Sequence, residues 1–250
     1  MQAYGPIFAD VYNRRWSGFA KQVAPLILEF YSETATGETY RSVLDLGCGT
    51  GQLALHFLKN GYEIVGIDAS EHMLHYAREN VHDYVDAGQA TFIQGDVTDF
   101  HLGSKFGLVV YTFDTLNHLA HEDALIKCFH CVSSVCDGYF IFDLNTRRGL
   151  NRWNNIQVDD SDEMLIMTRG IYDGQGDRAW TRITGFVKRE GGSFERFDET
   201  AFNTVFELSR VKEELHRAGW SNVYFAQVRD LATPLEEPEQ EGRVLIVASK

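Results

Sequence analysis

The chain has 250 residues, of which 44% are hydrophobic, so it can bury a sizeable core as one large domain or as one domain with an insertion. Its formal net charge of −13 repels phosphate backbones and argues against long nucleic acid as a partner. Because there is no apolar run of about 18 residues and no basic segment leading into an apolar one, neither a membrane span nor a secretory signal is expected.

The first 150 residues alternate between helical and extended patterns. Residues 7–31 are predicted to be helical with a break near Pro25, and residues 34–40 to form a polar loop. Five short apolar runs are typical of strands buried on both faces; they lie at 41–46, 62–68, 91–97, 106–112 and 139–145. The segments between them have helical periodicity, and Ser70 is placed to cap one of these helices.

The cysteines invite a metal or redox interpretation. Cys128 and Cys131 form a C-x-x-C pair, but they lie in a segment with helical periodicity and no second pair has ligand spacing. We therefore expect buried helical cysteines and no metal site. Free thiols fit a reducing, cytoplasmic location.

Residues 151–206 change to period-two segments joined by Gly-rich turns, which indicates antiparallel hairpins. A helix at 209–219 and strands at 221–229 and 242–249 follow, with an acidic surface loop at 233–242. The order predicts a doubly wound, seven-stranded α/β sheet with an inserted antiparallel lid. The predicted parts are an N-terminal helical lid (1–35), a nucleotide-binding domain (36–150 and 207–250) and the insertion (151–206).

The segment "LDLGCGTGQ" (44–52) joins the first strand to a helix, where ligands bind in such sheets. Its glycines have G-x-G-x-G spacing, and Gln52 stands where a dinucleotide fingerprint has its third glycine. Asp45 would repel a pyrophosphate and suits a ligand with an ammonium and a sulfonium group. NAD or flavin binding is therefore disfavoured.

Six segments in order resemble the class I S-adenosylmethionine-dependent methyltransferases. They are "VLDLGCGTGQLAL" (43–55), "IVGIDASEHML" (64–74), "FIQGDVTDF" (92–100), "FGLVVYTFDTLNHL" (106–119), "GYFIFDLNT" (138–146) and "ELHRAGW" (214–220). The resemblance implies S-adenosylmethionine (SAM) as cofactor and S-adenosylhomocysteine as product.

The resemblance also implies cofactor-binding roles at the ends of the strands. Asp45 would anchor the methionine amino group, and Asp68 would accept hydrogen bonds from both ribose hydroxyls. Tyr111 would lie beside the methionine moiety. The backbone wall would be Gly47, Cys48, Gly49 and Gly51, and the adenine contacts would be Ala69, Met73, Asp96 and Val97.

The sequence gives less information about the methyl acceptor. Residues 112–115, "TFDT", lack the proline-rich tetrapeptide of methyltransferases that act on exocyclic nucleic-acid amines, which favours a small-molecule acceptor. The insertion resembles the lid of small-molecule N-methyltransferases, in which a tyrosine of an N-terminal helix closes over the cofactor. Candidates from that helix are Tyr4, Tyr12 and Trp16, for which ordinary core packing is the alternative.

His118 is a candidate acceptor-side base, although a His that is only hydrogen-bonded is the commoner outcome. Four residues are expected at the rim of the acceptor site, where arginines would favour a carboxylate or phosphate; they are Asn117, Asn145, Arg147 and Arg152.

The leading hypothesis is methyl transfer to N or O of a small polar metabolite. A non-catalytic or regulatory SAM-binding protein and an NAD(P)-dependent oxidoreductase are the alternatives. The hairpins are also expected to be able to pair edge to edge across a homodimer.

Overall fold

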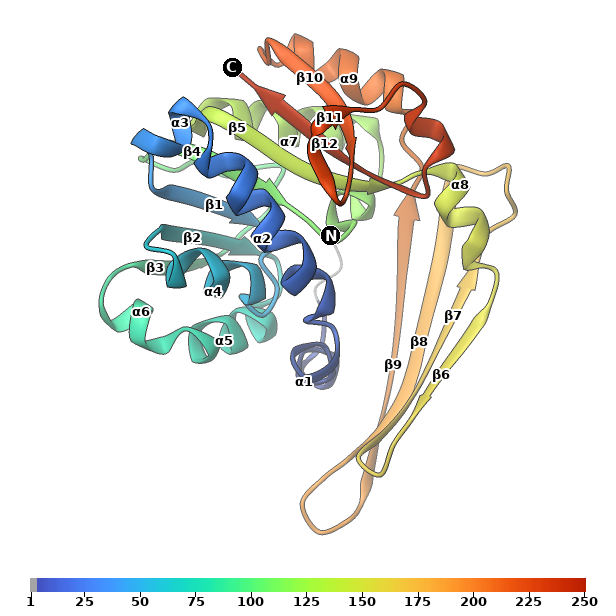
Figure 1. The fold of residues 1–250 in the computed structure, drawn as a ribbon. Coiled ribbons are helices and arrows are strands. Elements are labelled where there is room, and N and C mark those ends of the chain that lie inside the picture. The colour runs from blue at the N-terminus through green and yellow to red at the C-terminus, as the bar shows by residue number, and fades with distance from the viewer. Residues whose placement is uncertain (1–3) are drawn as a thin grey trace.

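The computed structural model describes residues 4–250. Its centre is a sheet of eight strands in the order β11-β10-β12-β5-β4-β1-β2-β3, covered by helices on both faces (Figure 1). β1 to β5 run parallel, and β12, β10 and β11 add antiparallel strands beyond β5. The strands are β1 (Ser42–Leu46), β2 (Glu63–Asp68), β3 (Ala90–Gln94), β4 (Phe106–Tyr111), β5 (Cys136–Asn145), β10 (Asn222–Gln227), β11 (Asp230–Pro234) and β12 (Arg243–Ser249).

The helices divide between the two faces because successive strand side chains point to opposite sides. In β1, Leu44 and Leu46 belong to the core under α7 and α9, whereas Val43 belongs to the core under α2, α4 and α5. The α-helices are α1 (Pro6–Arg15), α2 (Gly18–Ser32), α3 (Ala35–Thr39), α4 (Gln52–Lys59), α5 (Glu71–Asn80), α6 (His82–Asp86), α7 (Glu122–Val135), α8 (Arg147–Leu150) and α9 (Leu208–Arg217). Short 3-10 helices are η1 (Thr115–His118), η2 (Asn151–Trp153) and η3 (Pro238–Gln240).

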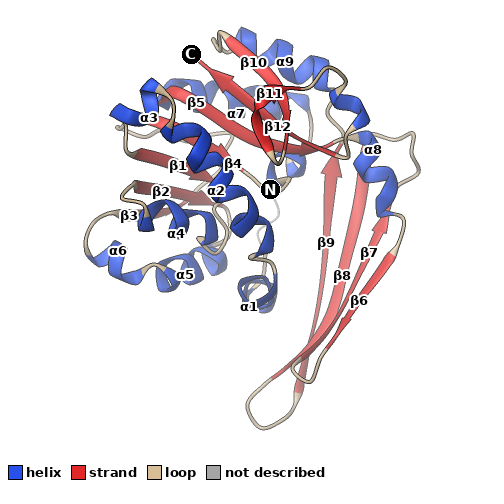
Figure 2. Cartoon of the chain, in the orientation of Figure 1, coloured by secondary structure: helices blue, strands red, loops and turns tan. Residues whose placement is uncertain are grey.

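A second, antiparallel sheet stands apart from the first and forms a long lid (Figure 2). Its strands follow the order β6-β7-β8-β9, and they are β6 (Ile156–Asp160), β7 (Met164–Ile171), β8 (Arg178–Lys188) and β9 (Phe194–Thr204). α1 contacts both parts, because Phe8 and Val11 pack with Met73 of α5 and with Met164 and Phe197 of the lid. The predicted α/β sheet with an antiparallel insertion is confirmed.

Three local predictions differ from the structure. The N-terminal helix breaks at Trp16–Ser17, and α2 continues through Pro25 because burial of Val23, Ala24, Ile27 and Tyr31 holds it against the sheet. The predicted loop 34–40 contains α3, whose first turn is capped by the Thr34 hydroxyl. The acidic loop begins with β11, an eighth strand anchored by the buried Leu231.

Cys128 and Cys131 lie on α7 as predicted, with Cys128 in the core, and all four cysteines are free thiols. Among residues 4–250, no helix combines the length and apolar character that a bilayer crossing requires.

Candidate active site

The glycine-rich loop follows β1 with three residues in the left-handed region. Gly47, Gly49 and Gly51 have φ of 57°, 54° and 75°, a conformation that glycine adopts without a Cβ penalty. A Cβ on Gly47 would lie 2.6 Å from Thr115 Cγ2, and one on Gly49 would lie 3.5 Å from the Tyr12 ring. The backbone of this loop is therefore tightly enclosed by η1 and α1.

Two predicted wall residues turn away from the cavity beside this loop. A Cβ on Gly51 would lie 3.2 Å from Ala77 of α5. The absence of a side chain at Gly51 therefore allows α5 to pack closely against the loop. The Cys48 thiol is buried in the core, 2.9 Å from where a Cβ on Gly66 would lie. Any cofactor contact from Cys48 therefore comes through its backbone.

Asp45 and Asp68 lie at the carboxyl ends of the adjacent strands β1 and β2. Asp68 accepts hydrogen bonds from the backbone N–H of Gly49 and of Ser70, each at 2.9 Å, and lines the cavity. Asp45 is 2% exposed, and its Oδ2 has no hydrogen-bond partner in the described chain. Burial and the neighbouring Asp68 raise the pKa of Asp45 to about 8, and burial also raises the pKa of Asp68. An unpartnered buried carboxylate is costly, which makes Asp45 a strong candidate for binding a cationic group.

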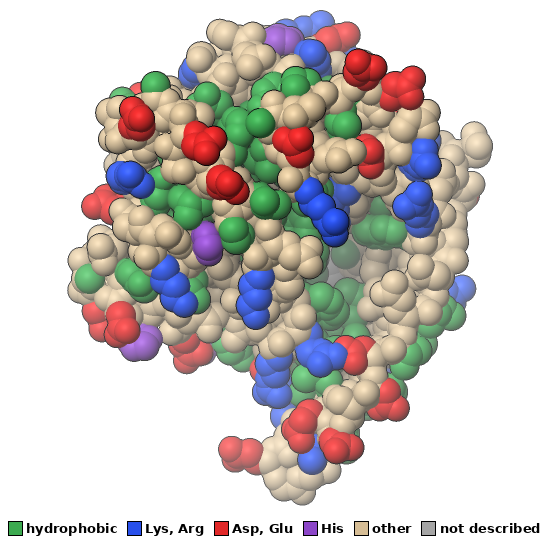
Figure 3. Space-filling model, in the orientation of Figure 1, with side chains coloured by type: hydrophobic (Ala, Val, Ile, Leu, Met, Phe, Trp, Pro, Cys, Tyr) green, Lys and Arg blue, Asp and Glu red, His purple; other side chains and the backbone are tan. Residues whose placement is uncertain are grey.

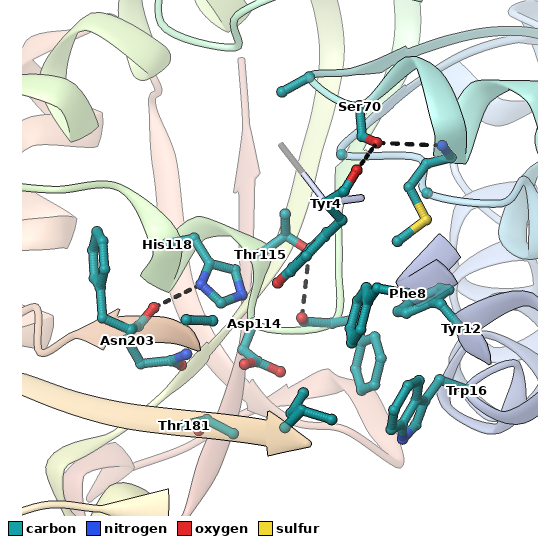
Figure 4. Close-up of a pocket in the computed structure, with 18 of the residues that line it drawn as sticks. Tyr4, Phe8, Tyr12, Trp16, Ser70, Asp114, Thr115, His118, Thr181 and Asn203 are labelled. Carbon is teal, nitrogen blue, oxygen red and sulfur yellow. Dashed lines mark hydrogen bonds between the residues drawn. The ribbon is translucent and has the colours of Figure 1, made fainter. Parts of the chain in front are cut away.

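The cavity continues from this loop to the inner face of the lid. Figure 3 shows the recess between the body and the lid, lined by hydrophobic side chains. Its wall near the ends of β2 and β3 includes Ala69, Met73 and Val97, whose adenine contacts stay a prediction. The far wall combines aromatic side chains with neutral polar ones from the lid; these are Tyr4, Phe8, Tyr12, Trp16, Thr168, Thr181, Thr200 and Asn203 (Figure 4).

His118 points into this cavity from η1 (Figure 4). Its Nδ1 lies 2.6 Å from the carbonyl oxygen of Phe202 in β9. Because a carbonyl can only accept, Nδ1 carries the proton, and in the neutral ring Nε2 keeps its lone pair. The lid therefore sets the tautomer that a base at this position needs.

Two predicted cofactor residues have other contacts. The Asp96 side chain is exposed and accepts hydrogen bonds from the N–H and hydroxyl of Thr98, both at 2.8 Å. Tyr111 is fully buried beneath the loop, where a Cβ on Gly47 would be 3.0 Å from its ring. Their roles toward a cofactor stay predictions.

The predicted polar rim is not assembled. Asn117 is buried and bonds to the backbone of Asn145 and Thr204, which ties η1 to β5 and β9. Arg147 bonds to the Tyr172 hydroxyl and pairs with Glu207, so it is held outside the cavity. Asn145 and Arg152 are likewise absent from the cavity wall among the described residues. Long-range partners that no local pattern reveals hold the side chains of Asn117, Asn145 and Arg147.

Several residues that were not predicted from the sequence line the acceptor end of the cavity. Phe113 and Asp114 directly follow β4 and line the cavity. Their place at the carboxyl end of a parallel strand was a usable signal. The sequence also contained a signal for the threonines of the lid, because Thr168 and Thr181 alternate with exposed apolar residues along their strands.

Comparison with known proteins agrees with this geometry. Residues 43–137 match the family model described as a methyltransferase domain. A protein from Geobacillus sp. (strain WCH70), itself only provisionally named a methyltransferase, is 28% identical over 216 residues, covering 84% of this chain and 85% of that protein. A dTDP-3-amino-3,4,6-trideoxy-alpha-D-glucopyranose N,N-dimethyltransferase from Streptomyces venezuelae is 36% identical over 119 residues, 47% of each chain.

Among solved structures, an S-adenosylmethionine-dependent methyltransferase from Clostridium acetobutylicum ATCC 824 has the same fold. It covers 97% of both chains with a TM-score of 0.78 at 23% identity. The protein therefore has the class I methyltransferase fold, and residues 43–137 are similar to the methyltransferase domain model.

Proposed function

We propose that this protein transfers a methyl group from SAM to a nitrogen or oxygen of a small polar metabolite. The observation that carries the proposal is the buried Asp45 and the partly buried, cavity-lining Asp68, which flank the glycine loop at the carboxyl ends of β1 and β2. The relative from Streptomyces venezuelae is an N,N-dimethyltransferase, which favours nitrogen.

The residues present fit SAM. The unpartnered Asp45 Oδ2 would receive the methionine ammonium, and Asp68 would hold the ribose hydroxyls. Ala69, Met73 and Val97 supply an apolar adenine contact. When bound, SAM supplies a methyl group already activated by its positive sulfur, so the protein mainly orients the acceptor and excludes water.

The cavity chemistry supports a small acceptor. Among its described lining residues none is Lys or Arg, so the expected arginine contacts to a carboxylate or phosphate are not available. Hydroxyl groups from the lid and aromatic rings from α1 suit a polar ring or chain. In this proposal α1 and the lid, both packed in one apolar cluster, close the acceptor site from water.

Tyr12 and His118 are the proposed catalytic residues, with different roles. Burial raises the pKa of Tyr12, so its hydroxyl stays protonated and acts as a hydrogen-bond donor or packing surface over the loop. His118 has Nε2 free to accept a proton from the acceptor, since Phe202 holds Nδ1. Replacement of His118 by Gln is expected to lower kcat by about 10²-fold or more while SAM affinity stays within twofold.

Thermal shift with SAM, S-adenosylhomocysteine and NAD tests the cofactor. A ligand at 100 times its Kd adds about 2.7 kcal/mol to the free energy of unfolding. Stabilisation by NAD alone would favour the oxidoreductase alternative, and no stabilisation by either sulfur nucleoside would refute SAM binding. A screen of metabolites with labelled SAM then separates an enzyme from a SAM-binding protein without activity.

We further propose that the outer face of the lid forms a homodimer interface by face-to-face packing. Of the ten exposed large hydrophobic residues among residues 4–250, this face carries eight, which are Ile156, Val158, Leu165, Met167, Ile171, Trp180, Phe186 and Phe194. At about 3.3 Å per residue and about 4.8 Å between strands, the four strands present roughly 550 Å² before side-chain relief. That approaches the area of about 800 Å² per partner in standard interfaces.

A second copy fits this face because large apolar side chains cover it and Asp198 partly neutralises Arg182 and Arg196. Light scattering after gel filtration should give a dimer for the native chain and a monomer for Trp180→Arg. The control Ile93→Arg, on β3, should stay dimeric. A native monomer at high concentration would contradict the interface.

A further inference from the structure

The turn after β4 is strained and held by a charge cluster. Phe113 and Asp114 are consecutive non-glycine residues with φ of 67° and 47°. Such residues cost of order 1–3 kcal/mol each and persist only where the surroundings enforce them. Asp143 of β5 accepts a hydrogen bond from the Asp114 backbone N–H at 2.9 Å, which fixes the turn.

Arg243 of β12 completes the cluster. Its two terminal nitrogens pair with Asp114 Oδ1 at 2.6 Å and with Asp143 Oδ2 at 2.8 Å. Its guanidinium also lies over the rings of Phe19 and Phe113, 4.7 and 5.8 Å from their centroids. The two rings and Asp143 hold the Arg243 guanidinium, and Arg243 in turn fixes the position of the Asp114 carboxylate. Arg243 and Asp143 both lie far from Asp114 in the sequence.

With two carboxylates and one guanidinium, the cluster has an excess of negative charge, and this charge faces the cavity. One arginine faces two carboxylates, and Asp143 is fully buried, so Asp114 is the carboxylate that reaches the cavity wall. Arg243 donates to Asp114 Oδ1. Asp114 Oδ2 has no hydrogen-bond partner in residues 4–250 and is not one of the fully buried polar atoms, so it is open to the cavity. Figure 4 shows this carboxylate facing the space between Thr181 of the lid and Phe8 of α1.

The surroundings of Asp114 favour a cation over a neutral hydroxyl. The rings of Phe8 and Trp16 line the same cavity, and aromatic faces attract cations. Among residues 4–250, Arg243 is the only cation that pairs with Asp114, and no Lys or Arg lines the cavity itself. A protonated amine would therefore meet a carboxylate and aromatic rings in a site shielded from water, where a charge pair is strong.

We propose that Asp114 is the specificity residue that binds the amino group of the methyl acceptor, which makes the acceptor a cationic amine. The inference rests on the proposed function and narrows its acceptor atom to nitrogen. The bound ammonium first loses one proton to His118 Nε2 or to water, which frees the nitrogen lone pair, and this pair then forms the new bond to the methyl carbon. The carbon–sulfur bond breaks with its electron pair remaining on sulfur, and the positive charge passes from sulfur to the methylated nitrogen. The Asp114 carboxylate stabilises that charge as it develops.

The test compares Asp114→Asn with a matched control, Asp143→Asn. Asparagine tolerates the left-handed conformation and keeps an oxygen for Arg243, so the turn should survive. The control removes the charge of Asp143 but keeps an amide oxygen at the Oδ2 position, which accepts from both the Asp114 N–H and Arg243, so the turn is held and the cavity keeps its carboxylate. Circular dichroism checks folding, and calorimetry checks SAM affinity, which should stay within twofold in both variants.

The readouts are binding to protein saturated with S-adenosylhomocysteine and methylation with labelled SAM. Probes are amine and hydroxyl pairs: dTDP-linked 3-amino and 3-hydroxy hexoses, glucosamine and glucose, and ethanolamine and ethylene glycol. The native protein should prefer an amine over its hydroxyl partner by at least tenfold. Asp114→Asn should reduce that preference at least tenfold, and Asp143→Asn should keep it within threefold.

Four results would overturn the assignment. They are a native preference for the hydroxyl partners, an unchanged preference in Asp114→Asn, an equal loss in Asp143→Asn, and no binding or methylation of any amine by native protein that binds SAM. Failure of SAM and S-adenosylhomocysteine to bind at all would instead refute the proposed function.

Discussion

Replacing Asp45 by Asn should stabilise the ligand-free protein while weakening SAM binding. Asp45 is buried, its Oδ2 has no hydrogen-bond partner within residues 4–250, and burial raises its pKa from the ordinary 3.8 to about 8. Asparagine has nearly the same shape and no charge at any pH. The substitution therefore removes a cost that the native protein carries for its ligand.

The magnitude follows from proton linkage. Between pH 4 and pH 8 the folded state keeps the Asp45 proton that the unfolded state has lost, so the free energy of unfolding falls as pH rises. One proton accounts for at most about 1.4 kcal/mol per pH unit, or about 2.7 kcal/mol between pH 5 and pH 7. Asp45→Asn should lose this slope, so its stability relative to the native chain should rise by about 1–3 kcal/mol over that interval.

Urea denaturation of ligand-free protein at pH 5, 6 and 7 measures the difference. Asp162→Asn, at an exposed turn residue, serves as the control and should follow the native curve. Calorimetry should show SAM affinity reduced at least tenfold in Asp45→Asn, since its amide offers no charge to an ammonium. Parallel pH dependences for the native protein and Asp45→Asn would refute the argument from burial.

Three further predictions concern the cofactor, the fold and the base. Asp68→Ala should lower SAM affinity by about 100-fold, because hydrogen bonds to a charged group contribute about 1.5–3 kcal/mol each; unchanged affinity in calorimetry would refute its ribose role. Gly149→Ala should lower the free energy of unfolding by about 1–3 kcal/mol, since its Cβ would lie 1.9 Å from the Gly242 carbonyl oxygen, whereas Gly103→Ala, with open space around it, should have little effect in the same denaturation assay. His118→Gln should lower kcat by about 10²-fold, as loss of a general base requires; a kcat equal to that of the native protein would rule His118 out.

The sequence was most informative where local pattern and sheet geometry coincide. Asp45 is the penultimate residue of β1 and Asp68 the last residue of β2, and parallel neighbouring strands bring such ends to one edge, so their proximity could be predicted. The glycines between them indicated an enclosed loop for the same reason. The period-two segments of 151–206 likewise predicted an antiparallel insertion, although they did not say where it would lie.

Only the tertiary structure decided which side chains meet in the acceptor cavity. Asp114 and Arg243 are 129 residues apart, and His118 meets Phe202 across 84 residues, separations that no periodicity reports. The continuous helix through Pro25 also depends on tertiary structure, because burial of the surrounding apolar face overrides the local tendency of proline to break a helix. Local sequence determines strands, caps and turns because these depend on neighbouring residues. The acceptor cavity depends on how the lid, α1 and β12 pack, and that packing is settled by contacts between distant segments.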